Sequence, residues 1–206
     1  MKIIEPGFEI LTEFTGHELE NLEKVGRTCY KSEDKISEGS AEKFVRMLVN
    51  RGHEAILEHG VITVRFICDR GISHQIVRHR IASFAQESTR YCSYDKGKYG
   101  GEITVIKPCF LEEGTPNYDR WYLACRNAEE QYMKMLRHGM TAEEARSVLP
   151  NSLKTEVIMT ADYREWRHFF AMRCSKAAHP QIREIAIPLQ KEFAKHIPVL
   201  FEDSDE

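Results

Sequence analysis

The sequence predicts an α+β fold in which an antiparallel β-sheet is flanked by α-helices. In residues 61–68, apolar and polar side chains alternate from Ile62 to Phe66, which is typical of a half-buried strand in an antiparallel sheet. Residues 17–30, 40–51 and 117–138 instead carry apolar side chains at helical spacing. Strands and helices are mixed without a regular βαβ rhythm, so α+β is favoured over a doubly wound parallel sheet.

Between these segments the sequence indicates a helix over 70–80, an ordered polar loop over 81–100 and a short strand over 103–106. Thr141 and Glu144 have capping-box spacing, which predicts a short helix that Pro150 ends.

The last third of the chain is expected to hold one strand and two helices. The strand covers 153–161, and Asp162 with Glu165 forms a second capping-box pattern, opening a helix to about Cys174. Pro180 should start the final helix, and Pro188 should kink or break it. The acidic tail, residues 202–206, is expected to fray.

Composition is that of one ordinary globular domain, expected over residues 1–206, with 42% hydrophobic and 30% charged residues. The formal net charge of -3 disfavours general nucleic-acid binding, because such binding depends on many basic contacts to phosphate. The six cysteines include no CxxC pair, and neither a signal peptide nor a membrane span is evident. We therefore expect a cytoplasmic protein that binds no membrane, with cysteines that are mostly buried small hydrophobes.

The most informative segment runs from Arg78 to Tyr91 and reads RHRIASFAQESTRY. Its three arginines offer planar, bidentate donors suited to phosphate. Ser88 and Thr89 add small donors, and Gln86 can donate and accept, as recognition of a base edge requires. This inventory suits a nucleoside monophosphate, although composition alone leaves a solvated basic face as an equal alternative.

Arg-His-Arg, seven residues, a serine and then Arg-Tyr two positions on resembles the signature of flavin-dependent thymidylate synthases. Three further motifs have that family's placement, and with the signature they extend the resemblance over roughly residues 45–190: Gly52-His53-Glu54-x-x-x-Glu58-His59, Ala145-Arg146-x-x-Leu149-Pro150 and Arg164-x-x-x-His168-x-x-x-x-Arg173. The chain departs from the family pattern at Ala85-Gln86, where Asn-Glu is common, and at His168, where asparagine is frequent.

The resemblance implies the fold of that family, a homotetramer with active sites shared between subunits, and methylation of dUMP to dTMP. FAD is the implied cofactor, with NADPH and methylenetetrahydrofolate as co-substrates. The implied dUMP ligands are Gln75, Arg78, Gln86, Glu87, Ser88, Thr89, Arg90, Arg146 and Arg173, the last also catalytic. The implied FAD ligands are His53, Ala55, Arg78, His79, Arg80, Gln86, Asp162, Arg164 and His168.

Arg173 is also singled out by helical spacing. It follows Trp166 by seven positions, on the apolar stripe that includes Phe169 and Phe170, so its guanidinium is expected to point inward. A buried charge needs a partner, which is either an internal carboxylate or a bound anion.

Two other classes of protein stay open on the sequence alone. A non-enzymatic nucleotide- or RNA-binding module would use the basic segment 78–90. A metal-dependent hydrolase would use His53 and His59, but these two histidines do not have HExxH spacing, and we expect no metal. Ser88 and Cys92 are conceivable nucleophiles, with a binding role favoured for Ser88.

Overall fold

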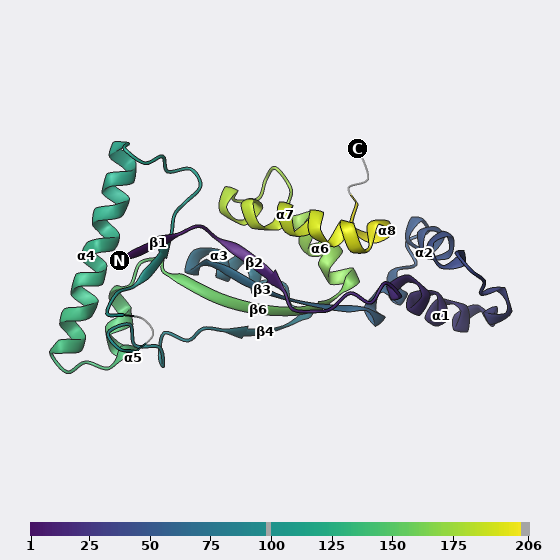
Figure 1. The fold of residues 1–206 in the computed structure, drawn as a ribbon, viewed down its shortest axis with the longest axis horizontal. Coiled ribbons are helices and arrows are strands. Elements are labelled where there is room, and N and C mark those ends of the chain that lie inside the picture. The colour runs from purple at the N-terminus through teal and green to yellow at the C-terminus, as the bar shows by residue number, and fades with distance from the viewer. Residues whose placement is uncertain (98–99, 203–206) are drawn as a thin grey trace. The chain divides into compact units, whose positions relative to one another are not determined.

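The fold contains a four-stranded antiparallel sheet with strand order β2-β3-β6-β4, seen in a computed structural model that describes residues 1–97 and 100–202 (Figure 1). The strands are β2 (Gly7–Ile10), β3 (Val61–Asp69), β6 (Lys154–Asp162) and β4 (Ala82–Gln86). Burial along β3 and β6 alternates residue by residue, as expected for strands with two different faces. The predicted α+β class is therefore confirmed.

The chain divides into two compact units, and all four strands pass from one unit into the other. Unit 1 comprises residues 1–8, 65–78 and 84–158, and unit 2 comprises residues 9–64, 79–83 and 159–206. The single domain over 1–206 stays a prediction.

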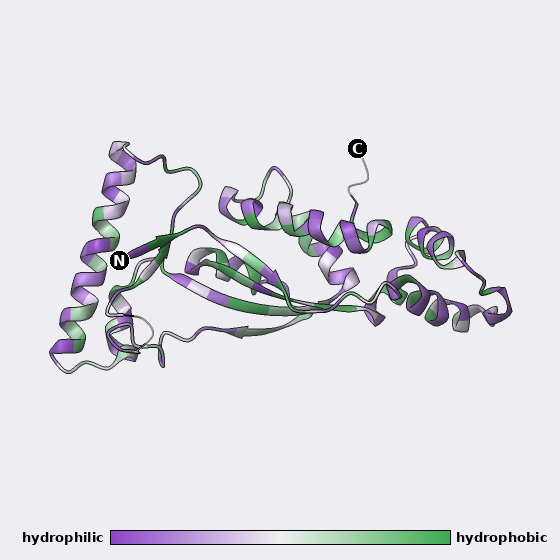
Figure 2. Cartoon of the chain, viewed as in Figure 1, coloured by the Kyte–Doolittle hydropathy of each residue, from purple (hydrophilic) through white to green (hydrophobic). Residues whose placement is uncertain are grey.

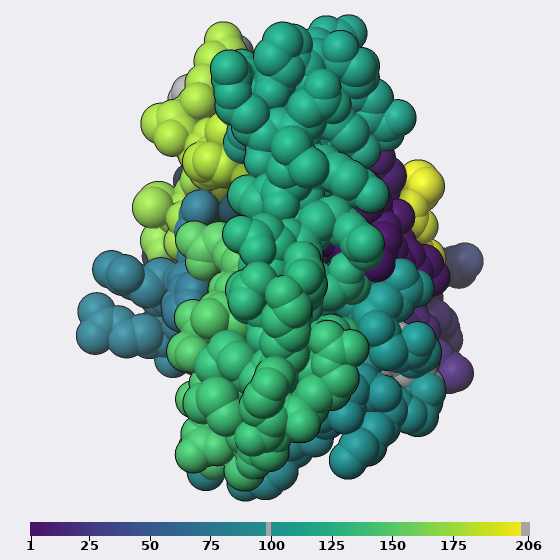
Figure 3. Space-filling view, turned by 90° about the vertical axis from the view of Figure 1, so that its left-hand side faces the viewer, coloured from purple at the N-terminus to yellow at the C-terminus, as the bar shows by residue number. Residues whose placement is uncertain are grey.

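Unit 1 contains a second, two-stranded sheet and the longest helix. Strand β1 (Lys2–Ile4) pairs in parallel with β5 (Thr104–Ile106). The helices are α3 (Arg70–Ile76), α4 (Pro116–Arg137), α5 (Ala142–Ala145) and the 3-10 turn η4 (Arg146–Val148). Tyr132 of α4 packs with Ile103 and Val105 in a buried cluster, which fixes the inner face of this helix. Figure 3 shows α4 at the surface of unit 1. Leu123 of this helix is 65% exposed.

Unit 2 is built around aromatic side chains. Its helices are α1 (Glu18–Tyr30), α2 (Ser40–Asn50), α6 (Tyr163–Arg173), α7 (Pro180–His196) and α8 (Pro198–Phe201), with the 3-10 segments η1 (Glu33–Lys35) and η2 (Glu54–His59). Trp166 and Phe169 of α6 are completely buried, and both Trp166 and Phe170 pack against Phe193 of α7. Hydrophilic and hydrophobic residues alternate along α4 and α7 (Figure 2).

Several sequence predictions need correction. Residues 81–100 are not all loop, because Ala82–Gln86 form β4; residues 98–99 lie outside the described part of the chain, as do 203–206 of the predicted frayed tail. The helix expected over 70–80 ends at Ile76, and α7 continues through Pro188 without a break. The structure also contains β1, β2 and α8, which the sequence pattern does not predict.

The cysteines are less uniform than expected. Only Cys68 and Cys125 are buried, whereas Cys29 and Cys109 are exposed. Burial raises the pKa of the Cys68 thiol to about 12, which keeps it protonated and unreactive. Over the described residues, none of the helices combines the length and apolar character that crossing a bilayer requires.

Candidate functional site

The segment that follows α3 presents polar groups along β4 and the turn after it. Gln86, at the end of β4, donates from Nε2 to Ser73 Oγ at 3.0 Å and to Thr155 Oγ1 at 3.3 Å. Glu87 forms an ion pair with Lys154, at 3.0 Å from Oε2 to Nζ. These contacts lie within unit 1 and hold the start of the 86–90 segment against β6.

The next residues are joined to the α5–η4 region. Thr89 is buried, and its Oγ1 accepts from Arg146 Nη1 at 3.2 Å. Arg90 makes a two-point contact with Glu143, from Nε at 2.8 Å and from Nη2 at 3.2 Å. Both side chains of this second pair are about half exposed, so the pair contributes little to stability and a phosphate can replace the carboxylate on Arg90. The sequence does not predict Glu143 as a site residue, since nothing local marks it as a partner of Arg90.

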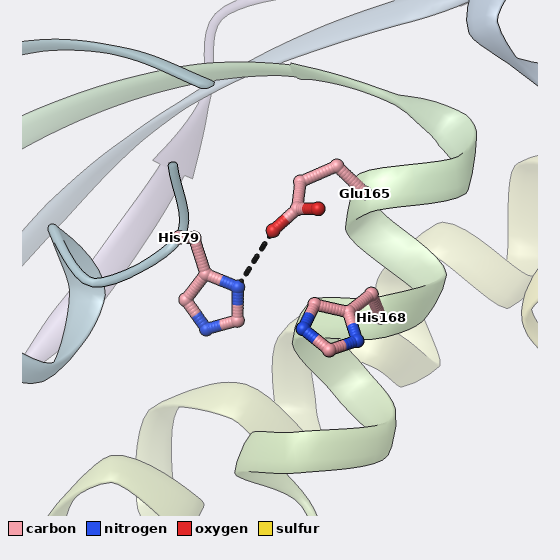
Figure 4. A group of neighbouring side chains, drawn as sticks. All are labelled: His79, Glu165 and His168. Carbon is pink, nitrogen blue, oxygen red and sulfur yellow. Dashed lines mark hydrogen bonds and ion pairs between the residues drawn. The ribbon is translucent and has the colours of Figure 1, made fainter. Parts of the chain in front are cut away.

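The predicted capping box is complete at the start of α5 but only half formed at the start of α6. At Thr141 and Glu144 both reciprocal hydrogen bonds are present, as predicted. At α6, Asp162 accepts from the backbone N–H of Glu165, but the Glu165 side chain does not return to the cap. It bonds instead to His79, at 2.8 Å from Oε1 to Nδ1 (Figure 4).

Glu165 and His79 belong to a three-membered chain of side chains inside unit 2. His79 is only 4% exposed and Glu165 only 7%. Arg173, in the last turn of α6, donates from Nε to His79 Nε2 at 3.0 Å. Because a guanidinium can only donate, Nε2 must be the accepting nitrogen. Nδ1 therefore carries the ring proton and donates a hydrogen bond to Glu165.

Electrostatics agree with a neutral His79. Burial is the largest cause that lowers the pKa of this imidazole, and the neighbouring Arg173 charge lowers it further, while the hydrogen bond to Glu165 opposes both. A protonated ring would present a second donor to Arg173 and lose the hydrogen bond between them. The arrangement therefore requires the neutral form of His79, which its lowered pKa favours at neutral pH.

Two neighbouring hollows of unit 2 lie beside the hydrogen-bonded side chains of Glu165, His79 and Arg173. One, of about 580 Å³, is lined by the backbone or side chains of Glu54, Glu58, Ile81, Asp162, Arg164, Glu165, Arg167, His168 and Ala171. The other, of about 410 Å³, is lined by residues that include His53, Ala55, Glu54 and Arg164. Arg164 lines both hollows, and it pairs with Glu58 at 2.6 Å and with Glu54 at 3.6 Å.

The hollows suit a flavin in size and chemistry. Volumes of this order are usual for cofactor pockets. Ile81 is 70% exposed and gives an apolar surface for a ring system, while Arg164 and His168 offer hydrogen-bond donors at its edges. Five residues that the sequence analysis assigned to FAD line one hollow or the other: His53, Ala55, Asp162, Arg164 and His168.

The other predicted site residues fall in different places. Arg78 and Arg80 are exposed, in unit 1 and unit 2 respectively, and Gln75 is half-buried in unit 1. His79 is buried behind the first hollow rather than lining it. The predicted dUMP ligands lie in unit 1 apart from Arg173, and the predicted FAD ligands in unit 2 apart from Arg78 and Gln86.

His79, Glu165 and His168 also place ligating atoms within 4.8 Å of one another. Such a set resembles a metal site, but His79 already accepts from the Arg173 cation at Nε2. A divalent ion on Nδ1 would displace the proton and sit close to this positive charge, which disfavours it.

Comparison with known proteins places the chain in a family of enzymes. Residues 10–199 match the family described as "Thymidylate synthase complementing protein". The flavin-dependent thymidylate synthase of Pyrococcus furiosus is 36% identical over 82% of this chain and 69% of its own length, and that of Geobacter sulfurreducens is 32% identical over 86% and 78%. A solved structure of PolB from Streptomyces cacaoi, a UMP/dUMP methylase bound with 5-Br dUMP, is 25% identical with a TM-score of 0.80, over 98% of this chain and 96% of PolB.

The chain belongs to the family of thymidylate synthase complementing proteins. Within it, the relatives that cover most of the sequence are flavin-dependent thymidylate synthases, so the resemblance seen in the sequence is confirmed.

Proposed function

We propose that this protein is a flavin-dependent thymidylate synthase that methylates dUMP to dTMP. The observation that carries the proposal is the Arg78–Tyr91 segment, which holds the family signature and displays anion-binding groups along β4 and the following turn. FAD reduced by NADPH supplies the hydride, and methylenetetrahydrofolate supplies the one-carbon unit.

The chain's own residues bind and orient the reactants. Arg90 binds the dUMP phosphate. The phosphate, a doubly charged anion, replaces the Glu143 carboxylate and accepts the same two hydrogen bonds from the planar guanidinium. Arg146 and Thr89, already hydrogen-bonded to each other, complete the cradle. Gln75, Arg78, Gln86, Glu87 and Ser88 contact the nucleotide, with Ser88 in a binding role.

Arg173 stabilises negative charge that develops on the pyrimidine ring, as a fixed donor prepared before the reaction begins. His53, Ala55, Asp162, Arg164 and His168 hold the flavin in the two hollows, with Arg78, His79, Arg80 and Gln86 as the further predicted contacts. Cytoplasmic localisation stays a prediction.

The function is tested by a spectrum and a single-turnover reaction. The purified protein, incubated with FAD, should be yellow after desalting. Its NADPH-reduced flavin should reoxidise under anaerobic conditions only when dUMP and methylenetetrahydrofolate are both present, with one dTMP formed per flavin. A colourless protein that takes up no FAD even with dUMP present would contradict the proposal. Anaerobic reoxidation that ignores dUMP would contradict it too.

We also propose that the protein is a homotetramer whose active sites draw on several subunits. Four reactants exceed what one modest domain readily surrounds, and the exposed apolar side chains Leu123 and Phe110 of unit 1 are suited to contacts between copies. Light scattering coupled to size exclusion should give about four times the 24.0 kDa chain mass. An active monomer at the same concentration would overturn this proposal.

A further inference from the structure

Glu165 lines the first hollow, but its buried carboxylate is not among the groups assigned above to dUMP or FAD. It is held in α6, whose backbone at this position is fixed by the Asp162 cap. Its side chain leaves the capping pattern to reach His79, a residue 86 positions earlier in the chain. A buried carboxylate is costly unless it is hydrogen-bonded, so this contact is a specific feature of the local structure.

We infer that Glu165 is a positioning residue for the methylation reaction: it fixes His79 as the Nδ1–H tautomer, so that Nε2 accepts from Arg173 and orients its guanidinium. The inference rests on the proposed function, because it gives Arg173 the pyrimidine-binding role.

The geometry gives the direction of this effect. His79 has two ring nitrogens, and the group that binds one nitrogen determines the protonation of the other. A carboxylate on Nδ1 can only accept, which leaves Nε2 as an acceptor for Arg173 Nε at 3.0 Å. An amide in its place can also donate to Nδ1, which would allow the opposite tautomer and put a donor against Arg173.

His79 is well suited to transmit this constraint. Its ring packs against Phe169 at a centroid distance of 4.9 Å and edge-on to His168 at 5.5 Å, so it cannot swing freely. Arg173 lies in the last turn of α6, where a long flexible side chain needs a fixed acceptor to hold one orientation. All of these contacts lie within unit 2.

The test compares Glu165→Gln, Arg173→Ala and the double variant, each loaded with FAD, by calorimetric titration with dUMP. We expect Glu165→Gln to weaken dUMP binding about tenfold, and to cause no further loss once Arg173 is alanine, because the two residues act in series. Glu165→Asp, which keeps the charge on a shorter arm, should retain part of the affinity.

Glu23→Gln is the matched control. Glu23 is another buried carboxylate of unit 2, 1% exposed, which pairs with Arg27 and accepts from Ser40 rather than contacting a histidine. Its replacement should lower the melting temperature without changing dUMP affinity.

A second measurement remains available if Glu165→Gln does not fold. Nitrogen-15 spectra of histidine-labelled wild-type protein should show His79 neutral and protonated at Nδ1. Protonation at Nε2, a doubly protonated ring, or stoichiometric zinc in the purified protein would overturn the inference.

The outcomes distinguish a failure of the positioning role of Glu165 from a failure of the dUMP-binding role of Arg173. Wild-type dUMP affinity in Glu165→Gln, together with weakened binding in Arg173→Ala, defeats only the role of Glu165. Additive losses in the double variant defeat it as well, since they show that Glu165 acts independently of Arg173. Unchanged dUMP binding in Arg173→Ala defeats the proposed role of Arg173 instead.

Discussion

Replacing Arg173 by alanine should lower dUMP-dependent kcat/KM by about 30- to 1000-fold, which corresponds to ~2–4 kcal/mol of lost transition-state stabilisation. The sequence left two partners open for this arginine, an internal carboxylate or a bound anion. The structure gives it a neutral partner, His79, at 3.0 Å. Removal of the guanidinium therefore does not leave His79 as an unpaired buried charge.

The stability of the ligand-free protein separates the two interpretations. Loss of the hydrogen bond to neutral His79 should cost about 1–2 kcal/mol, whereas a broken buried salt bridge would cost ~3–5 kcal/mol. Thermal unfolding and turnover should be measured on the same preparations. Arg173→Lys keeps the charge but loses the planar fork, so an intermediate loss of turnover is expected. A large drop in melting temperature with normal residual activity would show that Arg173 is structural.

The elements that the sequence predicts well are those whose pattern is local and periodic. The alternation after Val61 and the helical spacing before Tyr30 and in α4 reflect burial of one face, which the sequence records directly. The capping box at Thr141 is equally local and is confirmed with both hydrogen bonds.

The missed elements depend on partners far away in the sequence. Strand β1 has three residues and is defined by pairing with β5, about a hundred positions later. Strand β4 lies in a segment rich in polar and basic side chains, where pattern favours a loop. Pro188 illustrates the converse, because packing of Ile185 and Leu189 in the core holds α7 together across a residue that local rules expect to disrupt it.

The candidate site divides in the same way. The signature from Arg78 to Tyr91 is contiguous, so the sequence identifies its members, but not their present partners Glu143, Lys154 and Ser73. Glu165 carried only a capping signal, and its contact with His79 required the fold. Gln86 departs from the family pattern, and the structure shows why an amide is accommodated: it donates to two hydroxyls, Ser73 and Thr155, which an ionised carboxylate could not do.

The second large effect is expected on the free energy of unfolding, on replacement of Trp166, the residue that packs α6 against its neighbours. Trp166 is fully buried, contacts Phe169, Phe170 and Phe193, and donates from its indole to the backbone oxygen of Ile62 at 3.0 Å. Trp166→Ala should therefore cost ~3–5 kcal/mol, a large part of the total of about 5–15 kcal/mol typical of a domain.

Urea unfolding without flavin or dUMP should measure this loss, since bound ligands would add stability of their own. Trp166→Phe is the control that keeps most of the aromatic packing but loses the hydrogen bond to the Ile62 oxygen, at a cost of about 0.5–1.5 kcal/mol. The alanine variant should also bind dUMP less well, because Glu165 and Arg173 lie on the same helix and their alignment depends on its packing. A midpoint equal to that of wild type in Trp166→Ala would mean that the aromatic cluster does not hold α6 in place, and the positioning of Arg173 would then need another support.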